Sequence, residues 1–225
     1  MPVIDHPTIL RALDWAWTRA ARGLPGQDSA EELAKRHMDP DMPLETRLKR
    51  CIASHKRKAA VAGFVTSAGG AALLPASVPA NLASTLFVQL RMVQAMAVLC
   101  GHDLADTRVR ALCGLCLCGA KAASVAKEAG ARLGGRVAKD LLAQLGGETG
   151  ARVNRLVGLR LLARLGGESG TLGARLVPVV SGLIGAAWDA SITAGIGRAA
   201  LALLAPQAAS DAADQSFCGS RQDGS

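Results

Sequence analysis

A run of 32 residues without an ionisable side chain, 59–90, constrains the fold of this chain more than any other feature. Gly69-Gly70, Pro75 and Pro79 interrupt the run. Because Gly and Pro break helices, we expect two apolar helical arms around a turn. The first arm, residues 59–74, is shorter than the ~20 residues that a helix needs to cross a bilayer. Three interpretations stay open: a buried core hairpin, a re-entrant or shallowly inserted element, and the wall of a lipid pocket.

A cationic cluster comes directly before this apolar run, in a segment predicted to be helical. Its members are Arg47, Lys49, Arg50, Lys56, Arg57 and Lys58. Residues 46–102 contain no Asp or Glu, and the whole chain has a net charge of +8. Each Lys or Arg near an anionic membrane contributes about 1 kcal/mol to binding. The cluster is therefore either an anchor on anionic lipid headgroups or a solvated helix face.

The first part of the chain carries several helix signals. Residues 8–23 have apolar positions at helical spacing. Ser29 and Glu32 form a capping box for a short second helix that ends near Met38, and Pro43 suits the first turn of a third. The apolar positions of the first helix are Leu10, Leu13, Trp17, Ala20 and Leu24.

The second part of the chain predicts four further helical segments. One predicted helix spans residues 79–100 and ends at Gly101. Another runs from Asp103 or Asp106 to about residue 129. Asp106 and Arg110 are four positions apart on this second helix, a spacing that lets them pair on its surface. Residues 141–157 and 161–177 form a near-repeat, identical at 11 of 17 positions. We interpret it as short Leu-rich helices separated by Gly pairs. The last helix, 178–204, carries a stripe of small residues that lets another backbone approach closely. The stripe is Gly182, Ala186, Ala190 and Ala194.

These patterns predict an all-α fold: a single domain of about seven closely packed apolar helices rich in Ala, Gly and Leu. The domain comprises residues 1–205, with a core made by the arms of 59–100 against the closing helix. Residues 206–225 are rich in Ala, Ser, Asp and Gln, and we expect a disordered tail.

Two charged residues stand alone inside apolar helices. Arg91 lies between Gln89 and Gln94, and Asp189 lies in the closing helix. An isolated buried charge is costly, so each needs a partner. Either Arg91 and Asp189 pair across two packed helices, or Arg91 holds an acidic headgroup.

The six cysteines do not form the framework of a small secreted domain, so we place the chain in a reducing cytoplasm. Cys113, Cys116 and Cys118 read as CxxCxC, with Cys100 as a fourth candidate ligand. Because they fall within an apolar helical pattern, we expect buried thiols and no metal site.

Catalytic motifs give no assignable site in the sequence. His102-Asp103 and the hydroxyls of Ser67, Ser77 and Ser84 are candidates for catalysis. However, none of the serines stands in a GxSxG elbow, and no phosphate loop or HExxH motif is present. We assign no catalytic residue and no cofactor.

Residues 63–103, GFVTSAGGAALLPASVPANLASTLFVQLRMVQAMAVLCGHD, resemble the central signature of the EcsC family, and residues 176–200 resemble its closing helix. The resemblance implies a helical, largely bacterial protein, named for the third gene of an ABC-transporter operon. It supplies no catalytic residue.

Together these observations favour a protein at the inner face of the cell membrane, peripheral or monotopic, that binds anionic lipid or a membrane-protein partner. By family analogy that partner would belong to a transporter or to secretion. Arg91 joins the cationic cluster as a candidate anion ligand. The alternative is a hydrolase acting on a lipidic substrate. Nucleic-acid binding rests on charge alone, and we do not expect it.

Overall fold

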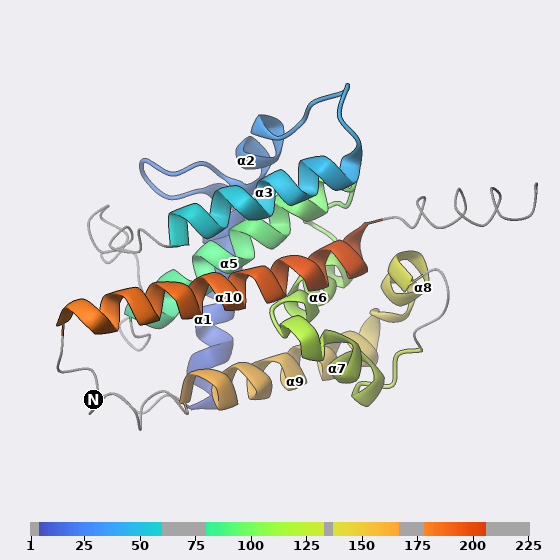
Figure 1. Cartoon of the computed structure of the whole chain (residues 1–225). Helices are drawn as coiled ribbons and strands as arrows, with labels where there is room; N and C mark the ends of the chain where they lie inside the picture. Colours follow the sequence, from blue (N-terminus) through green and yellow to red (C-terminus); the bar gives the residue numbers. More distant parts are fainter. Residues whose placement is uncertain (1–4, 60–79, 133–136, 167–177, 206–225) are drawn as a thin grey trace, which may run out of the picture.

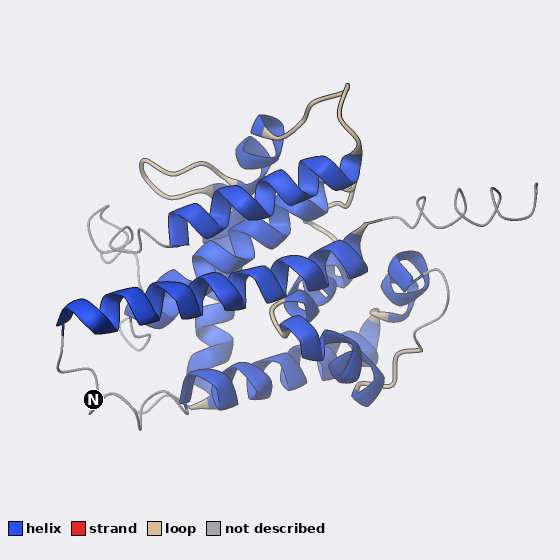
Figure 2. Cartoon of the chain, viewed as in Figure 1, coloured by secondary structure: helices blue, strands red, loops and turns tan. Residues whose placement is uncertain are grey.

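The computed structural model describes residues 5–59, 80–132, 137–166 and 178–205. Over these residues the chain forms nine α-helices and one 3-10 turn, with no strand, which confirms the all-α prediction and exceeds the seven helices expected (Figure 2). The elements are α1 (His6–Arg22), α2 (Ala30–Arg36), α3 (Leu44–Ala59), α5 (Ala80–Leu99), α6 (Thr107–Cys116), η2 (Gly119–Lys121), α7 (Ala122–Glu128), α8 (Val137–Gln144), α9 (Gly147–Gly166) and α10 (Pro178–Leu204).

Helix α5 is the centre of the fold. It is apolar around its whole circumference, as expected of a helix buried on all sides. It packs against α1, α2, α3, α6 and α10, and in Figure 1 α3 and α10 run beside it while α1 crosses behind. The predicted packing of this arm on the closing helix is confirmed. The other arm falls on residues 60–79, which lie outside the described residues, as does the predicted tail.

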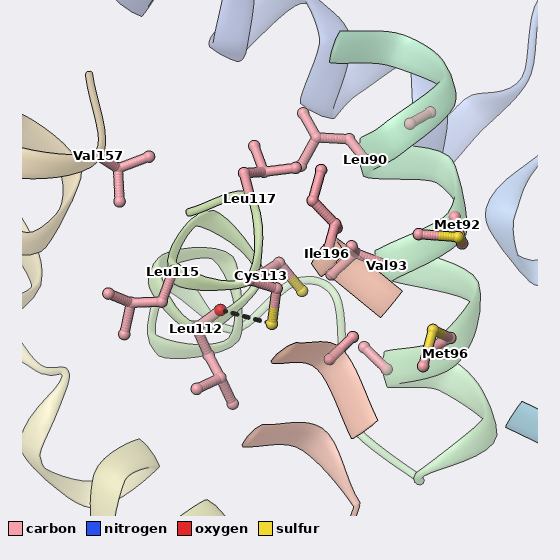
Figure 3. Packing of buried hydrophobic residues seen from close by; sticks show 14 of the residues in the cluster. Leu90, Met92, Val93, Met96, Leu112, Cys113, Leu115, Leu117, Val157 and Ile196 are labelled. Atoms are coloured by element: carbon pink, nitrogen blue, oxygen red, sulfur yellow. Dashed lines mark hydrogen bonds between the residues drawn. The ribbon is translucent and has the colours of Figure 1, made fainter. Parts of the chain in front are cut away.

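Side chains from three helices interlock beside α5. Figure 3 shows Leu90 and Val93 of α5 pointing toward Leu117, in the turn after α6, while Met92 and Met96 lie on another side of α5. Ile196 of α10 closes the same cluster. These side chains are buried, and the core is therefore built of aliphatic and sulfur-containing groups.

The predicted capping box of the second helix and the predicted end of α5 at Gly101 are confirmed. The Ser29 amide donates to Glu32 Oε2 at 2.7 Å, and the Glu32 amide donates to Ser29 Oγ at 3.1 Å, which completes the capping box. Gly101 follows α5 with a φ of +81°, the left-handed conformation that commonly ends a helix.

The single helix predicted from residue 103 or 106 to 129 is wrong. The chain breaks after Cys116, and the segments on either side of the break are bent by 120°. Gly119 adopts a φ of +56° at the break, and a Cβ there would lie 3.6 Å from the backbone of Gly195 in α10. The break therefore lies where the chain contacts α10, and residues 107–129 contain no Pro.

The predicted Asp106–Arg110 pair is also wrong. Asp106 is the N-cap of α6 and binds Arg108, whose Nη2 lies 2.7 Å from Asp106 Oδ2. Arg110 reaches instead to α1, where its Nη2 lies 2.7 Å from Asp14 Oδ1.

The near-repeat forms helices of unequal length. The predicted Gly pair lies where α8 gives way to α9: Gly146 follows α8 and Gly147 begins α9, but α9 has 20 residues and is not short. The second half of the repeat continues beyond the described residues.

The buried face of α1 differs from the predicted apolar stripe. Ile9, Ala12 and Ala16 are fully buried, whereas Leu10 is 37% exposed. The side chains that follow it in the stripe, Leu13 and Trp17, are half-buried. The first three positions of the stripe therefore lie at the edge of the core, whereas Ala20 and Leu24 are buried in it.

Candidate functional site

The cationic cluster lies on α3, and the structure places its members differently. Lys49 and Arg50 are exposed, and Lys49 Nζ pairs with Glu45 Oε1 at 2.6 Å. Arg47 is half-buried and lies close enough to Cys100 to act on the pKa of that thiol. The side chains of Lys56, Arg57 and Lys58 lie outside the described residues, although the helix continues through them to Ala59.

Arg91 is buried at the junction of α5 with the loop between α1 and α2. Its Nη1 donates to Gln27 Oε1 at 2.9 Å and to the Asp28 carbonyl at 3.4 Å, and its guanidinium lies 5.3 Å from the centre of the Phe87 ring. Burial lowers the pKa of Arg91, and the charge of Asp28 partly opposes that effect. The predicted partner Asp189 has a side chain outside the described residues, so the Arg91–Asp189 pair stays a prediction.

The two glutamines that flank Arg91 tie α5 to other helices. Gln94 Nε2 donates to the Trp17 carbonyl of α1 at 3.1 Å. Gln89 Oε1 accepts from Arg164 Nη2 of α9 at 3.2 Å, and Arg164 Nη1 donates to the Leu117 carbonyl. Hydrogen bonds from polar groups in an apolar core fix the orientation of the packed helices.

Two cysteines of the CxxCxC motif, Cys113 and Cys116, lie on α6 in the core, and Cys118 is half-buried on the turn that follows α6. Cys113 and Cys116 are fully buried, and burial raises the pKa of both thiols. Burial raises the pKa of Cys118 to about 11 and that of Cys100 to about 12. Among the described residues, no group of three or more His, Cys, Asp or Glu is arranged to hold a metal ion.

The candidate dyad His102-Asp103 forms the turn between α5 and α6. His102 Nε2 lies 3.0 Å from the Leu204 carbonyl at the end of α10, and Asp103 Oδ1 accepts from the Ala105 amide at 2.8 Å. Both residues thus shape the turn and its contact with α10. Ser67 and Ser77 lie outside the described residues, and Ser84 lies on α5.

A cavity of about 270 Å³ is the feature that the sequence analysis missed. It lies where α1, α6 and α9 meet beside α5, and Asp14, Arg110 and Asn154 line it together with apolar residues. Asp14 and Arg110 are 96 positions apart, so no local pattern could have joined them. The apolar stripe of the first helix, in which Leu13 and Trp17 are half-buried, is the local signal of this cavity in the sequence.

Among the described residues, one helix is long and apolar enough to cross a membrane. The segment is Leu82–Leu99 of α5, and 78% of it is buried inside the fold. The same test is met by the core helix of a soluble protein. The bent pair of segments after residue 106 would count as a second span only if it were taken as one.

The described chain is thus an all-helical domain built around one buried apolar helix. The model of the EcsC protein family matches residues 17–141, more than half of the chain, and the protein belongs to that family. The match contains the central signature, whereas the closing helix lies beyond it. No curated protein and no solved structure matches the chain.

Proposed function

We propose that this protein attaches to the anionic inner surface of the cell membrane from the cytoplasmic side and binds lipid there. The observation that carries the proposal is the position of Lys49 and Arg50. Both are exposed on α3, and α3 leads directly into residues 60–79, which contain no ionisable side chain. A basic face continuous with apolar sequence is typical of interfacial attachment.

The burial of α5 supports attachment at the surface over a membrane span. A helix that is packed on its neighbours cannot face lipid while the fold is intact, and Leu82–Leu99, the one described segment that is long and apolar enough to cross a membrane, is packed in this way. Membrane contact would then come from the surface of the domain. The cationic side chains would supply electrostatic attraction, and residues 60–79 would supply apolar contact.

Vesicle flotation of the full chain tests this proposal, with neutral vesicles compared with vesicles that contain phosphatidylglycerol. We expect binding to the anionic vesicles. Replacing Lys49 and Arg50 together by Gln removes about 2 kcal/mol of attraction, which is about a 30-fold loss of partitioning. The matched control replaces Lys121 and Lys127, two exposed lysines on η2 and α7, by Gln, and should bind like the wild type.

The dependence of vesicle binding on salt concentration separates the electrostatic contribution of the basic side chains from the apolar contribution of residues 60–79. Binding that persists in high salt would indicate that apolar residues insert, whereas binding that salt abolishes would indicate that the basic face acts alone. Absence of flotation under all conditions would overturn lipid binding and leave a membrane-protein partner as the next candidate. Equal losses in the α3 variant and the control would show that overall charge, and not this face, attracts the membrane.

A further inference from the structure

The cavity between α1, α6 and α9 is lined mainly by apolar side chains that the fold leaves partly uncovered. Leu13 and Trp17 of α1 are half-buried, and they face the cavity together with Leu90 of α5 and Val157 of α9. Ile9, on the neighbouring face of α1, is fully buried by contrast. Leu90 and Val157 are buried in the core, so the uncovered apolar surface of the cavity comes from α1.

Its mouth carries a cation held in a fixed position. Arg110 Nη2 binds Asp14 Oδ1 at 2.7 Å, and the guanidinium lies 5.6 Å from the centre of the Trp17 ring. The Asp14 side chain is 68% exposed and that of Arg110 is 39% exposed. Asn154 adds an exposed amide that both donates and accepts.

We propose that this cavity binds a single-chain amphiphile with a carboxylate head. The apolar chain would cover Leu10 and Leu13, and the head would take the place of Asp14 on Arg110. A guanidinium binds a carboxylate through two parallel hydrogen bonds. Because exposed ion pairs stabilise a fold little, displacing Asp14 costs little, and Arg110 would keep its contact with Trp17.

Size and charge both narrow the class of ligand. Pockets for small molecules usually have volumes of ~300–1,000 Å³, so a cavity of about 270 Å³ suits one short chain better than a two-chain lipid. The net charge of +8 favours an anion over a cation. The site is separate from α3, so this inference does not depend on the proposed attachment to the membrane.

Gly114 of α6 gives a direct way to fill the cavity. A Cβ at this position would lie 3.9 Å from Asn154 Oδ1 and from the Val157 methyl groups, which is an ordinary contact. The backbone therefore tolerates a side chain, and a leucine would extend into the space. Gly195 of α10, where a Cβ would meet nothing within 4 Å, provides the control.

Calorimetric titration of the full chain with sodium decanoate tests the proposal, with decanol as the uncharged analogue. We expect saturable binding to the wild type and to Gly195→Ala, and none to Gly114→Leu. Arg110→Gln should weaken decanoate binding about tenfold, the effect of losing one charged hydrogen-bond partner, and leave decanol binding unchanged. Asp14→Asn should tighten decanoate binding, because it removes the competing carboxylate.

Circular dichroism and thermal melting show whether each variant folds. If Gly114→Leu does not fold, Gly114→Ala is used in its place. Gly114→Ala should weaken binding of both ligands in part. Decanoate binding that is absent in the wild type, or equal in all folded variants, would overturn the proposal. Flotation on anionic vesicles should be the same for Gly114→Leu and the wild type, so failure at this cavity is distinguishable from failure at α3.

Discussion

Gly197 of α10 lies so close to Ile52 of α3 that a Cβ on the glycine would be 2.9 Å from three carbons of the isoleucine side chain. Two positions earlier, a Cβ at Gly195 would meet nothing within 4 Å. At Gly197, therefore, α3 and α10 approach too closely for a side chain on α10. Since α3 carries the exposed basic residues, this contact sets where they lie on the domain.

Gly197→Ala should be less stable than Gly195→Ala by about 1–3 kcal/mol, because the new methyl group forces Ile52 or the helices to shift. Both changes gain a similar amount from the better helix propensity of alanine, so the difference isolates the steric cost. Urea unfolding measures it. Combining Gly197→Ala with Ile52→Ala should show favourable coupling of the two substitutions. Equal stabilities of the two single variants would refute the close contact.

Two glycines in the loop before α2, Gly23 and Gly26, allow the cost of backbone strain to be measured apart from the cost of a steric clash. Gly23 has a φ of +83°, and a Cβ there would lie 2.8 Å from the Gln27 carbonyl oxygen. Gly26 has a φ of +74° with nothing within 4 Å. We expect Gly26→Ala to cost about 1 kcal/mol from strain and Gly23→Ala to cost about 1–3 kcal/mol more, since its obstacle is backbone. Thermal unfolding of both variants checks the order, and similar losses would argue against the loop conformation.

The sequence predicted those elements whose ends are coded locally. Ser29 and Glu32 satisfy each other within one turn, Gly101 ends α5 by its own conformation, and Pro178 begins α10. The break after Cys116 could not be predicted, because it depends on contact between Gly119 and Gly195. The small-residue stripe of α10 was placed on Gly182, Ala186, Ala190 and Ala194. The first three positions have side chains outside the described residues, and the close contact that the structure describes on α10 occurs at Gly197.

The candidate sites were less predictable because they join distant segments. Arg91 was correctly expected to need polar partners, but those described, Gln27 and the Asp28 carbonyl, come from a loop 63 to 64 residues away. Arg110 was paired with Asp106 because helical spacing favours neighbours four apart, yet Asp106 was already committed to capping α6.

Replacing Arg91 by lysine should make stability depend on pH. Burial lowers the pKa of the native Arg91 side chain, and it should lower that of a lysine there below its unfolded value of about 10.4. The folded variant then binds fewer protons than the unfolded chain, so its stability rises with pH. Relative to the wild type, Arg91→Lys should be destabilised most near neutral pH and recover as the pH approaches about 10. Urea unfolding across this range measures the effect, with Arg50→Lys as the exposed control. A penalty independent of pH would mean that the new ammonium group reaches water.

The buried thiols should resist alkylation in the native protein. At a pH of about 8, a thiol such as Cys118, with a pKa of about 11, is a thiolate in about one molecule in a thousand. Cys100, with its pKa of about 12, should react more slowly still, and Cys113 and Cys116 slowest of all because no solvent reaches them. Mass spectrometry of peptides after timed treatment with iodoacetamide gives the rate at each site, with urea-unfolded protein as the reference. Because the thiolate is the nucleophile, the rate at Cys118 should rise about tenfold per pH unit below its pKa. Alkylation of Cys113 as fast as in urea would show that the α5–α6 core opens locally in the native protein, and would contradict the full burial of this thiol.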